Sequence, residues 1–310
     1  MKAIEGRRRK AGRSHCGAGA DPLDTADLKR THVQASRRKT VMAANDEGFQ
    51  GSPISGEVLF YQQPEPLDAE RHKELGMKSS DRPFAFANKQ HFVPLHVTEF
   101  GPAAVNYPII FAGAERLPLA IMGLTAGENL YISEEGVFRP GAYIPAFIRR
   151  YPFVGAMDDA NKRSVVCIDR KAPQWVSRAE ADVMLFEDGQ PSQFTKNCIE
   201  FCSQFDTDRA QTAFFIKLLI DNDLFEPREA TYATFNADGT PGEPQKVSDF
   251  FAVSDAKLKA LAPETLVELR DNGALQQIFT HIASLYGWEK IIAESVQRRL
   301  GADPAVVGRA

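Results

Sequence analysis

The stretch Asn106–Phe153 constrains the fold of this chain more than any other part of the sequence. It interleaves aromatic residues, prolines and glycines with few polar residues. Prolines and glycines punctuate regular structure, so this stretch predicts short elements joined by turns. Within it, Tyr143–Phe153 reads YIPAFIRRYPF, with Pro145 near its start and Pro152 near its end. That pattern predicts one or two helical turns held at both ends.

The region from Phe92 onward has the rhythm of strands and turns. Apolar runs recur about every 8–12 residues, a spacing typical of short strands. The runs are HFVPLHV, NYPIIFA, LPLAIMGL, NLYISEE, SVVCIDR and ADVMLFEDG. Asp188–Gly189 predicts a hairpin turn, and Gly123 and Gly127 predict a tight turn between two strands. The polar stretch from His72 to Arg82 predicts a loop.

Helical patterns dominate the later part of the chain. Ser192 is a suitable N-cap for a helix whose apolar residues follow one face, and a second helix is expected from about Asp208. A hairpin follows, centred on Ala237–Pro244. Ser254 starts a short helix, and Pro263 starts another that Gly273 interrupts. A last long helix is expected to carry six residues on one face: Leu275, Ile278, Phe279, Ile282, Leu285 and Tyr286.

Strands first and helices last predict an α+β fold, with a β-rich N-terminal half of short antiparallel strands packed with a mainly helical C-terminal half. We expect one domain over residues 57–300. Residues 1–56 are expected to be a disordered, basic lead-in and residues 301–310 a flexible tail. Met42 is the favoured true start, because the patterned region begins shortly after it.

Charge is distributed unevenly along the chain. Residues 1–41 carry eleven Lys and Arg against four acidic residues, a local charge of +7, which leaves −11 for the rest of a chain of net charge −4. A basic head can bind nucleic acid, but the acidic body argues against such a partner. No apolar run is long enough for a transmembrane segment, and no apolar stretch of a secretory signal follows Met1 or Met42. A cytoplasmic location is therefore expected.

The cysteines and the standard motifs identify no catalytic residue. Cys16, Cys167, Cys198 and Cys202 have no disulfide-framework spacing, so we expect reduced thiols, with the last three acting as small buried hydrophobes. The phosphate-binding, dinucleotide-binding and nucleophile-elbow patterns are missing from the sequence, and no cofactor is expected.

Two histidines and a carboxylate form the weak candidate for a metal site. His91, His96 and Glu99 carry ligand groups that suit iron or zinc. The histidines are five residues apart, however, so in an extended strand they point to opposite sides. Solvated histidines at the ends of a strand are the favoured interpretation.

The charged and aromatic group Tyr143, Arg149, Arg150 and Tyr151 is the candidate binding site. Paired arginines beside aromatic rings can clamp a carboxylate, phosphate or glycan. They can equally pin a short helix by bonding its last carbonyl groups, and both interpretations stay open. Asp169, beside Arg170, is a candidate catalytic carboxylate, although an ion pair at the end of a strand is favoured.

From about Val58 to Ile292 the chain resembles the bacterial SapC family, which is linked by name to surface-layer proteins. The resemblance rests on LFYQQPEPLDAERH, EFGPAAVNYPIIF and VVCIDR, and most specifically on GLTAGENLYISEEGVFRPGAYIPAFIRRYPF. A weaker match closes the chain at DFFAVSDAKLKALAPETLVELRDNGALQQIFTHIASL. The resemblance implies a role in the cell envelope and surface association, and it brings no catalytic residues.

The favoured function is therefore a non-enzymatic binding or assembly component that holds a protein partner in the surface layer or cell envelope. Tyr143–Phe153 and its neighbouring loops would form the recognition surface. The alternative is an enzyme that modifies a small molecule or peptide, with or without a metal, near His91, His96 and Arg149.

Overall fold

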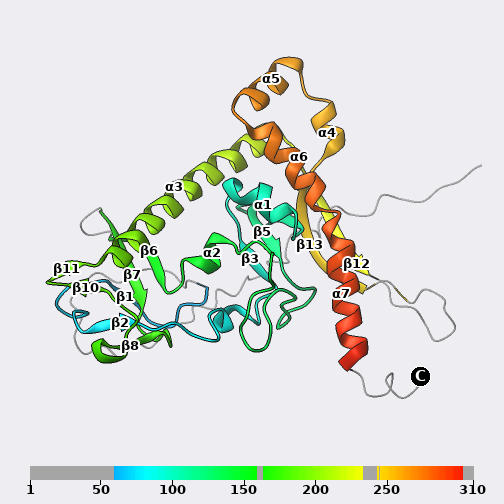
Figure 1. The fold of residues 1–310 in the computed structure, drawn as a ribbon. Coiled ribbons are helices and arrows are strands. Elements are labelled where there is room, and N and C mark those ends of the chain that lie inside the picture. The colour runs from blue at the N-terminus through cyan, green and yellow to red at the C-terminus, as the bar shows by residue number, and fades with distance from the viewer. Residues whose placement is uncertain (1–58, 159–162, 233–242, 244, 303–310) are drawn as a thin grey trace, which may run out of the picture. The chain divides into compact units, whose positions relative to one another are not determined.

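The structure is a computed structural model that describes residues 59–158, 163–232, 243 and 245–302 (Figure 1). Three predicted features lie outside these residues: the whole of the basic lead-in 1–56, most of the tail 301–310, and the turn of the late hairpin at 237–244 apart from Glu243.

The described strands form four sheets, and every pairing is antiparallel. The largest sheet has five strands, in the order β12 (Phe225–Tyr232), β13 (Gln245–Val253), β4 (Ile109–Ala112), β5 (Leu117–Ile121) and β3 (Phe92–Pro94). A three-stranded sheet joins β1 (Pro64–Pro66), β7 (Arg163–Asp169) and β6 (Phe153–Asp158). A second joins β8 (Trp175–Ser177), β2 (Leu75–Met77) and β9 (Val183–Met184), and β10 (Phe186–Glu187) pairs with β11 (Gln190–Pro191).

The longer helices follow the strand-rich region in sequence, which confirms the α+β fold. The α-helices are α1 (Phe100–Ala104), α2 (Ala146–Arg149), α3 (Gln193–Asp221), α4 (Asp255–Lys259), α5 (Pro263–Asp271), α6 (Ala274–Ser284) and α7 (Gly287–Ala302). Three short 3-10 helices are η1 (Ala85–Ala87), η2 (Val97–Glu99) and η3 (Arg178–Glu180). None of the helices in the described ranges has the length and apolar character needed to cross a bilayer.

One continuous helix, α3, replaces the two helices expected on either side of Asp208. Its predicted start is confirmed, because the Ser192 hydroxyl accepts a hydrogen bond from the backbone N–H of Thr195 at 3.2 Å. Asp206–Asp208 has the polar residues of a helix start but contains neither glycine nor proline. The Thr207 hydroxyl bonds within the helix, donating to the Ser203 carbonyl at 3.2 Å, and α3 packs in apolar clusters on both sides of this point.

Other sequence predictions were wrong in detail. The last long helix is two helices, α6 and α7, and both Phe279 and Tyr286 are exposed rather than buried with their neighbours. The predicted loop from His72 to Arg82 contains β2, because this short strand finds partners on both sides. The run NLYISEE forms only an isolated bridge, between Ile132 and Phe138.

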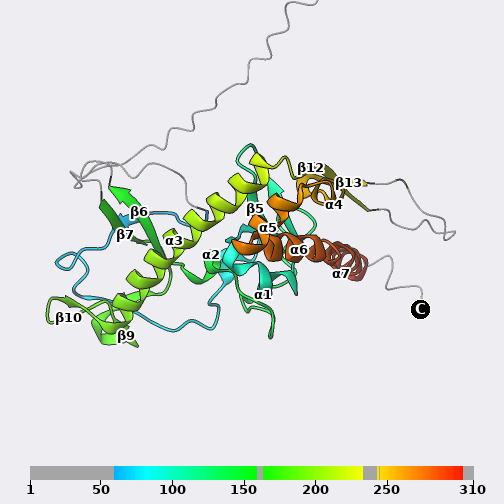
Figure 2. The same cartoon turned by 90° about the horizontal axis from the view of Figure 1, so that it is seen from above.

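Helix α3 takes part in all three apolar clusters of the described core. Figures 1 and 2 show it running from the β10–β11 hairpin toward α5. Its first turns pack beside β6 and β7, its middle packs against α2, and its last turns pack beside the five-stranded sheet. The α3 residues in these clusters are, in that order, Phe194, Cys198 and Cys202; Phe201 and Phe205; and Phe215, Ile216, Leu218 and Leu219.

The turn that follows β5 depends on a close backbone approach at Gly123. A Cβ atom there would collide with the carbonyl oxygen of Glu128. We expect Gly123→Ala to lower the free energy of unfolding by about 2 kcal/mol or more, because backbone must move to admit the methyl group. Urea unfolding measures this. The matched control is Gly101→Ala on α1, where nothing lies within 4 Å and the change should be neutral or stabilising by up to about 1 kcal/mol. Equal effects in the two variants would contradict the prediction.

Acid should destabilise the fold through His281. This buried imidazole accepts a hydrogen bond at Nε2 from the backbone N–H of Val253 at 3.1 Å, and its burial lowers its pKa to about 3. The unfolded chain keeps the ordinary histidine pKa of about 6.5. Between these values only the unfolded state takes up the proton, so stability falls as the pH falls from about 6.5 toward 3, by up to about 1.4 kcal/mol per pH unit.

Urea midpoints at several pH values measure this slope. His281→Gln keeps a carbonyl oxygen that can accept from Val253 and removes the titrating group. We expect a shallower loss of stability in acid for this variant than for the wild type. An unchanged slope would show that other groups cause the acid sensitivity.

Candidate functional site

The segment Tyr143–Phe153 folds as its sequence predicts, with a single helical turn at its centre. Pro145 is the residue before α2, and its carbonyl accepts from the backbone N–H groups of Ile148 at 2.9 Å and Arg149 at 3.1 Å. Proline suits this position because the first N–H groups of a helix have no partner within the helix. The turn ends at Arg150, and a cis peptide bond joins Tyr151 to Pro152.

The buried carboxylate of Glu99 ties this segment to η2. Its Oε1 accepts from the Tyr143 hydroxyl at 2.8 Å and from the Ala146 N–H, the first of α2, at 2.7 Å. Its Oε2 accepts from the backbone N–H of His96 at 3.0 Å. A carboxylate at a helix N-terminus is favoured by the helix dipole and by the N–H groups exposed there. Glu99 therefore has a structural role that accounts for its burial.

His96 is buried, so the prediction of a solvated histidine was wrong at this position. The ring of Phe205, from α3, lies edge-on to His96 at a centroid distance of 4.1 Å and covers it. His96 Nδ1 lies 3.6 Å from Glu99 Oε2, and burial lowers the pKa of His96. His91 is half-buried, and its ring packs against Phe92.

These three residues do not converge as a metal site would require. Among the residues that the structure describes, which include His91, His96 and Glu99, no three His, Cys, Asp or Glu side chains form a group that could hold a metal ion.

Arg149 is exposed and braced against aromatic rings. Its Nε donates to the carbonyl of Ile144 at 2.9 Å, and its Nη2 donates to the Tyr143 hydroxyl at 3.3 Å. Its guanidinium carbon lies 5.3 Å from the centroid of Phe201 on α3. The carbonyl that it bonds precedes α2, so Arg149 fixes the entry to the helix rather than its end.

Arg150 is buried, with 8% of its surface exposed. Its guanidinium carbon lies 4.2 Å from the ring centroids of both Phe147 and Phe205, and 5.8 Å from that of Tyr61. Its Nε has no hydrogen-bond partner within the described residues. Burial lowers the pKa of Arg150, since the charged form loses hydration. The side chain thus joins α2 to the middle of α3.

Tyr151 is half-buried and packs against an aromatic ring. It stacks on Phe86 with centroids 4.0 Å apart, and its hydroxyl donates to Asp169 Oδ2 at 3.2 Å. Burial raises the pKa of Tyr151. Of Tyr143, Arg149, Arg150 and Tyr151, only Arg149 is exposed.

Asp169 is a buried anchor for the chain that leads into β1, and the predicted ion pair with Arg170 was wrong. The carboxylate accepts from the backbone N–H groups of Gln62 at 3.1 Å and Gln63 at 2.8 Å. Arg170 instead approaches Glu65, with 3.7 Å between Nε and Oε1. Backbone N–H groups outside a sheet need acceptors when buried, and Asp169 supplies them.

The three described cysteines are free thiols: Cys198 and Cys202 pack in the cluster beside β6 and β7, and Cys167 lies on β7. Cys167 and Cys202 are buried and Cys198 is half-buried. Burial raises the pKa of Cys167 and of Cys202 to about 11, and that of Cys198 to about 12. Protonated thiols are poor nucleophiles, so these side chains act as small hydrophobes, as the sequence predicts.

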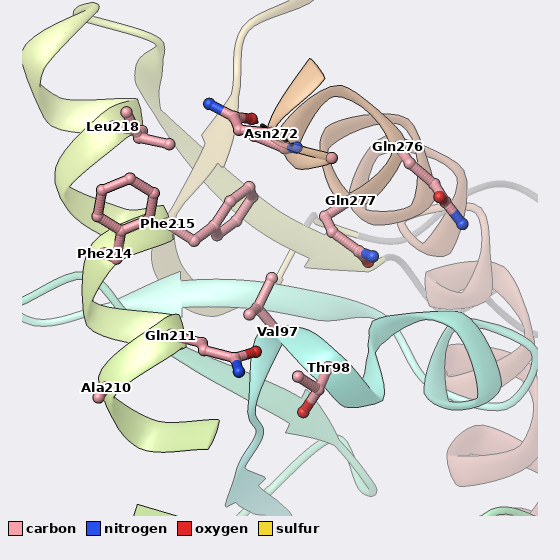
Figure 3. Close-up of a pocket in the computed structure, with 12 residues that line it drawn as sticks. Val97, Thr98, Ala210, Gln211, Phe214, Phe215, Leu218, Asn272, Gln276 and Gln277 are labelled. Carbon is pink, nitrogen blue, oxygen red and sulfur yellow. Dashed lines mark hydrogen bonds between the residues drawn. The ribbon is translucent and has the colours of Figure 1, made fainter. Parts of the chain in front are cut away.

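A groove that the sequence did not predict lies between α3, η2 and the start of α6 (Figure 3). Its volume is about 540 Å³. Phe214, on its α3 wall, is 60% exposed. Only the packing of α3, η2 and α6 shows that Phe214 faces this groove.

The two arginines should respond differently to removal. Arg150→Ala deletes a buried side chain between two rings and should lower the free energy of unfolding by about 2–4 kcal/mol. Arg149→Ala should cost about 1 kcal/mol or less, because its contacts are at the surface. Thermal melting of both variants tests this, and equal losses would assign both residues the same structural role.

A family model described as SapC matches residues 67–291 of the chain. No match is found to a curated protein or to a solved structure.

Proposed function

Because the chain belongs to the SapC family, we propose that it is a non-enzymatic component that binds a protein partner in assembly of the bacterial surface layer or cell envelope. The chain would then be located at the envelope while it is bound to that partner.

The geometry of Arg149 carries this proposal. An exposed arginine braced on aromatic rings is the type of residue that dominates protein interfaces. Its contacts with Ile144 and Tyr143 occupy Nε and Nη2, whereas a guanidinium carries five N–H donors. Donors therefore remain for a carboxylate or carbonyl of a partner.

The surroundings of Arg149 favour binding because they are already ordered. Glu99 holds the start of α2, and Arg150 holds its end against α3. A side chain that is fixed before association loses less conformational entropy on binding. Glu99 and Asp169, the carboxylates bonded to this segment, both accept hydrogen bonds from donors of this chain. This supports a structural role for the two carboxylates, in which they hold the binding surface in place.

Affinity capture with matched variants tests the proposal. The full chain, Arg149→Ala and Arg178→Ala are used to capture proteins from the envelope fraction of the source bacterium, and the captured proteins are quantified by mass spectrometry. Arg178 is an exposed arginine on η3 and serves as the control. We expect an envelope or surface-layer protein to bind the wild type and Arg178→Ala, and to bind Arg149→Ala about tenfold less.

Capture of the same proteins by all three forms would contradict a role for Arg149. Stoichiometric iron or zinc in the purified protein, measured by elemental analysis, would favour the enzyme alternative instead.

A further inference from the structure

Residues 59–61 form a strap that lies against α2. The ring of Phe60 packs edge-on against Phe147, with centroids 5.8 Å apart. The Arg150 guanidinium carbon lies 5.8 Å from the ring centroid of Tyr61. All three strap residues are half-buried. The strap thus supplies one of the rings that shield Arg150.

Side chains alone attach the strap to the other described residues. Its main-chain N–H and C=O groups form no hydrogen bond with the rest of the described chain. The Tyr61 hydroxyl donates to the carbonyl of Phe153 at 2.5 Å. The next two amides, of Gln62 and Gln63, are bonded to Asp169, so firm main-chain attachment begins just after the strap. A segment with so few hydrogen bonds can open without unfolding of the core.

Phe60 adds backbone strain to the strap. Its φ angle is 82°, a left-handed value that is rare for a bulky side chain. Such a conformation persists only where surrounding contacts enforce it, and it is often found at switch regions. Here the contacts of the Phe60 ring with Phe86 and Phe147 enforce it. Release of the strap would relieve the strain, which offsets part of the cost of losing these contacts.

Arg150 has unused hydrogen-bonding capacity beside the strap. A guanidinium carries five N–H donors, and the rings that shield its charge provide no oxygen acceptor. Its Nε has no partner among the described residues. The exposed Arg149 lies over Phe201, one helical turn before Phe205, the α3 ring beside Arg150. The two arginines therefore lie on neighbouring turns of α3, and paired guanidinium groups suit a carboxylate.

We infer that the strap is a displaceable cover, and that its opening exposes Arg150 beside Arg149 so that both bind a carboxylate of the protein partner. The inference rests on the proposed function and adds its regulation. The contacts of Arg150 with Phe147 and Phe205 do not involve the strap, so α2 stays on α3 when it opens. With the strap closed, only Arg149 of the pair is exposed.

Chemical modification of arginine measures this opening without any partner. The full chain is treated with phenylglyoxal, which reacts with accessible guanidinium groups, and tandem mass spectrometry measures Arg149 and Arg150 separately. Phe60→Ala removes the ring contacts and keeps an unfavourable φ angle. We expect Arg150 to react at least about tenfold faster in this variant than in the wild type, because two aromatic pairs are lost. Arg149 should react at the wild-type rate.

Two further variants separate opening of the strap from unfolding of the whole chain. Tyr61→Phe loses the bond to the Phe153 carbonyl and keeps the ring, so Arg150 should react about threefold faster. This variant decides the matter if Phe60→Ala does not fold. Gly123→Ala destabilises the core far from the strap and should leave the reaction of Arg150 unchanged. Wild-type rates in both strap variants, or equal acceleration in Gly123→Ala, would overturn the inference.

Capture of the envelope protein tests the link to binding. Phe60→Ala should capture more of this protein than the wild type does, because Arg150 is exposed more often. Equal or weaker capture by Phe60→Ala would also overturn the inference. The effect of Arg149→Ala on capture is measured independently, so the proposed function can stand when the strap fails its test. The modification rates, in turn, are informative even if no partner is captured.

Discussion

The contact on which the rest of the structure depends is the burial of the Arg150 guanidinium between Phe147 and Phe205. It fixes α2 against the middle of α3, and α3 in turn packs in each of the three apolar clusters. A buried charge is costly unless its surroundings compensate for the lost hydration. Here the rings of Phe147, Phe205 and Tyr61 do so through cation–π contacts. The irregular middle of the chain is thereby held to the longest regular element.

Buried acids solve a second problem created by the same irregular chain. Loops rich in proline and glycine leave backbone N–H groups without the partners that helices and sheets provide. Glu99 accepts from two backbone N–H groups and a tyrosine, and Asp169 accepts from the amides of Gln62 and Gln63. Acidic residues beside aromatics in such a sequence can therefore be scaffolding, and their presence alone does not identify a reactive centre.

Local signals in the sequence predicted the local structure well. Asp188–Gly189 forms its hairpin turn with positive φ angles of 49° and 73°, and Ser192 caps α3 through its own hydroxyl. Features set by distant contacts were not predicted. The continuity of α3 depends on packing along its whole length, and the burial of His96 depends on Phe205, which is remote in sequence. The groove beside Phe214 needs two helices and η2 together, so no single segment records it.

The same contacts that hold the core also order the surface proposed for binding. The backbone N–H of Val97 donates to Thr212 Oγ1 at 3.0 Å, which fixes η2 on α3 beside the groove, while Glu99 fixes the other end of η2 to α2. Arg149 and Phe214 are thus exposed side chains on a buried, hydrogen-bonded frame. A partner that contacts Arg149 would order few residues of this chain on binding, so more of the contact energy would remain as affinity.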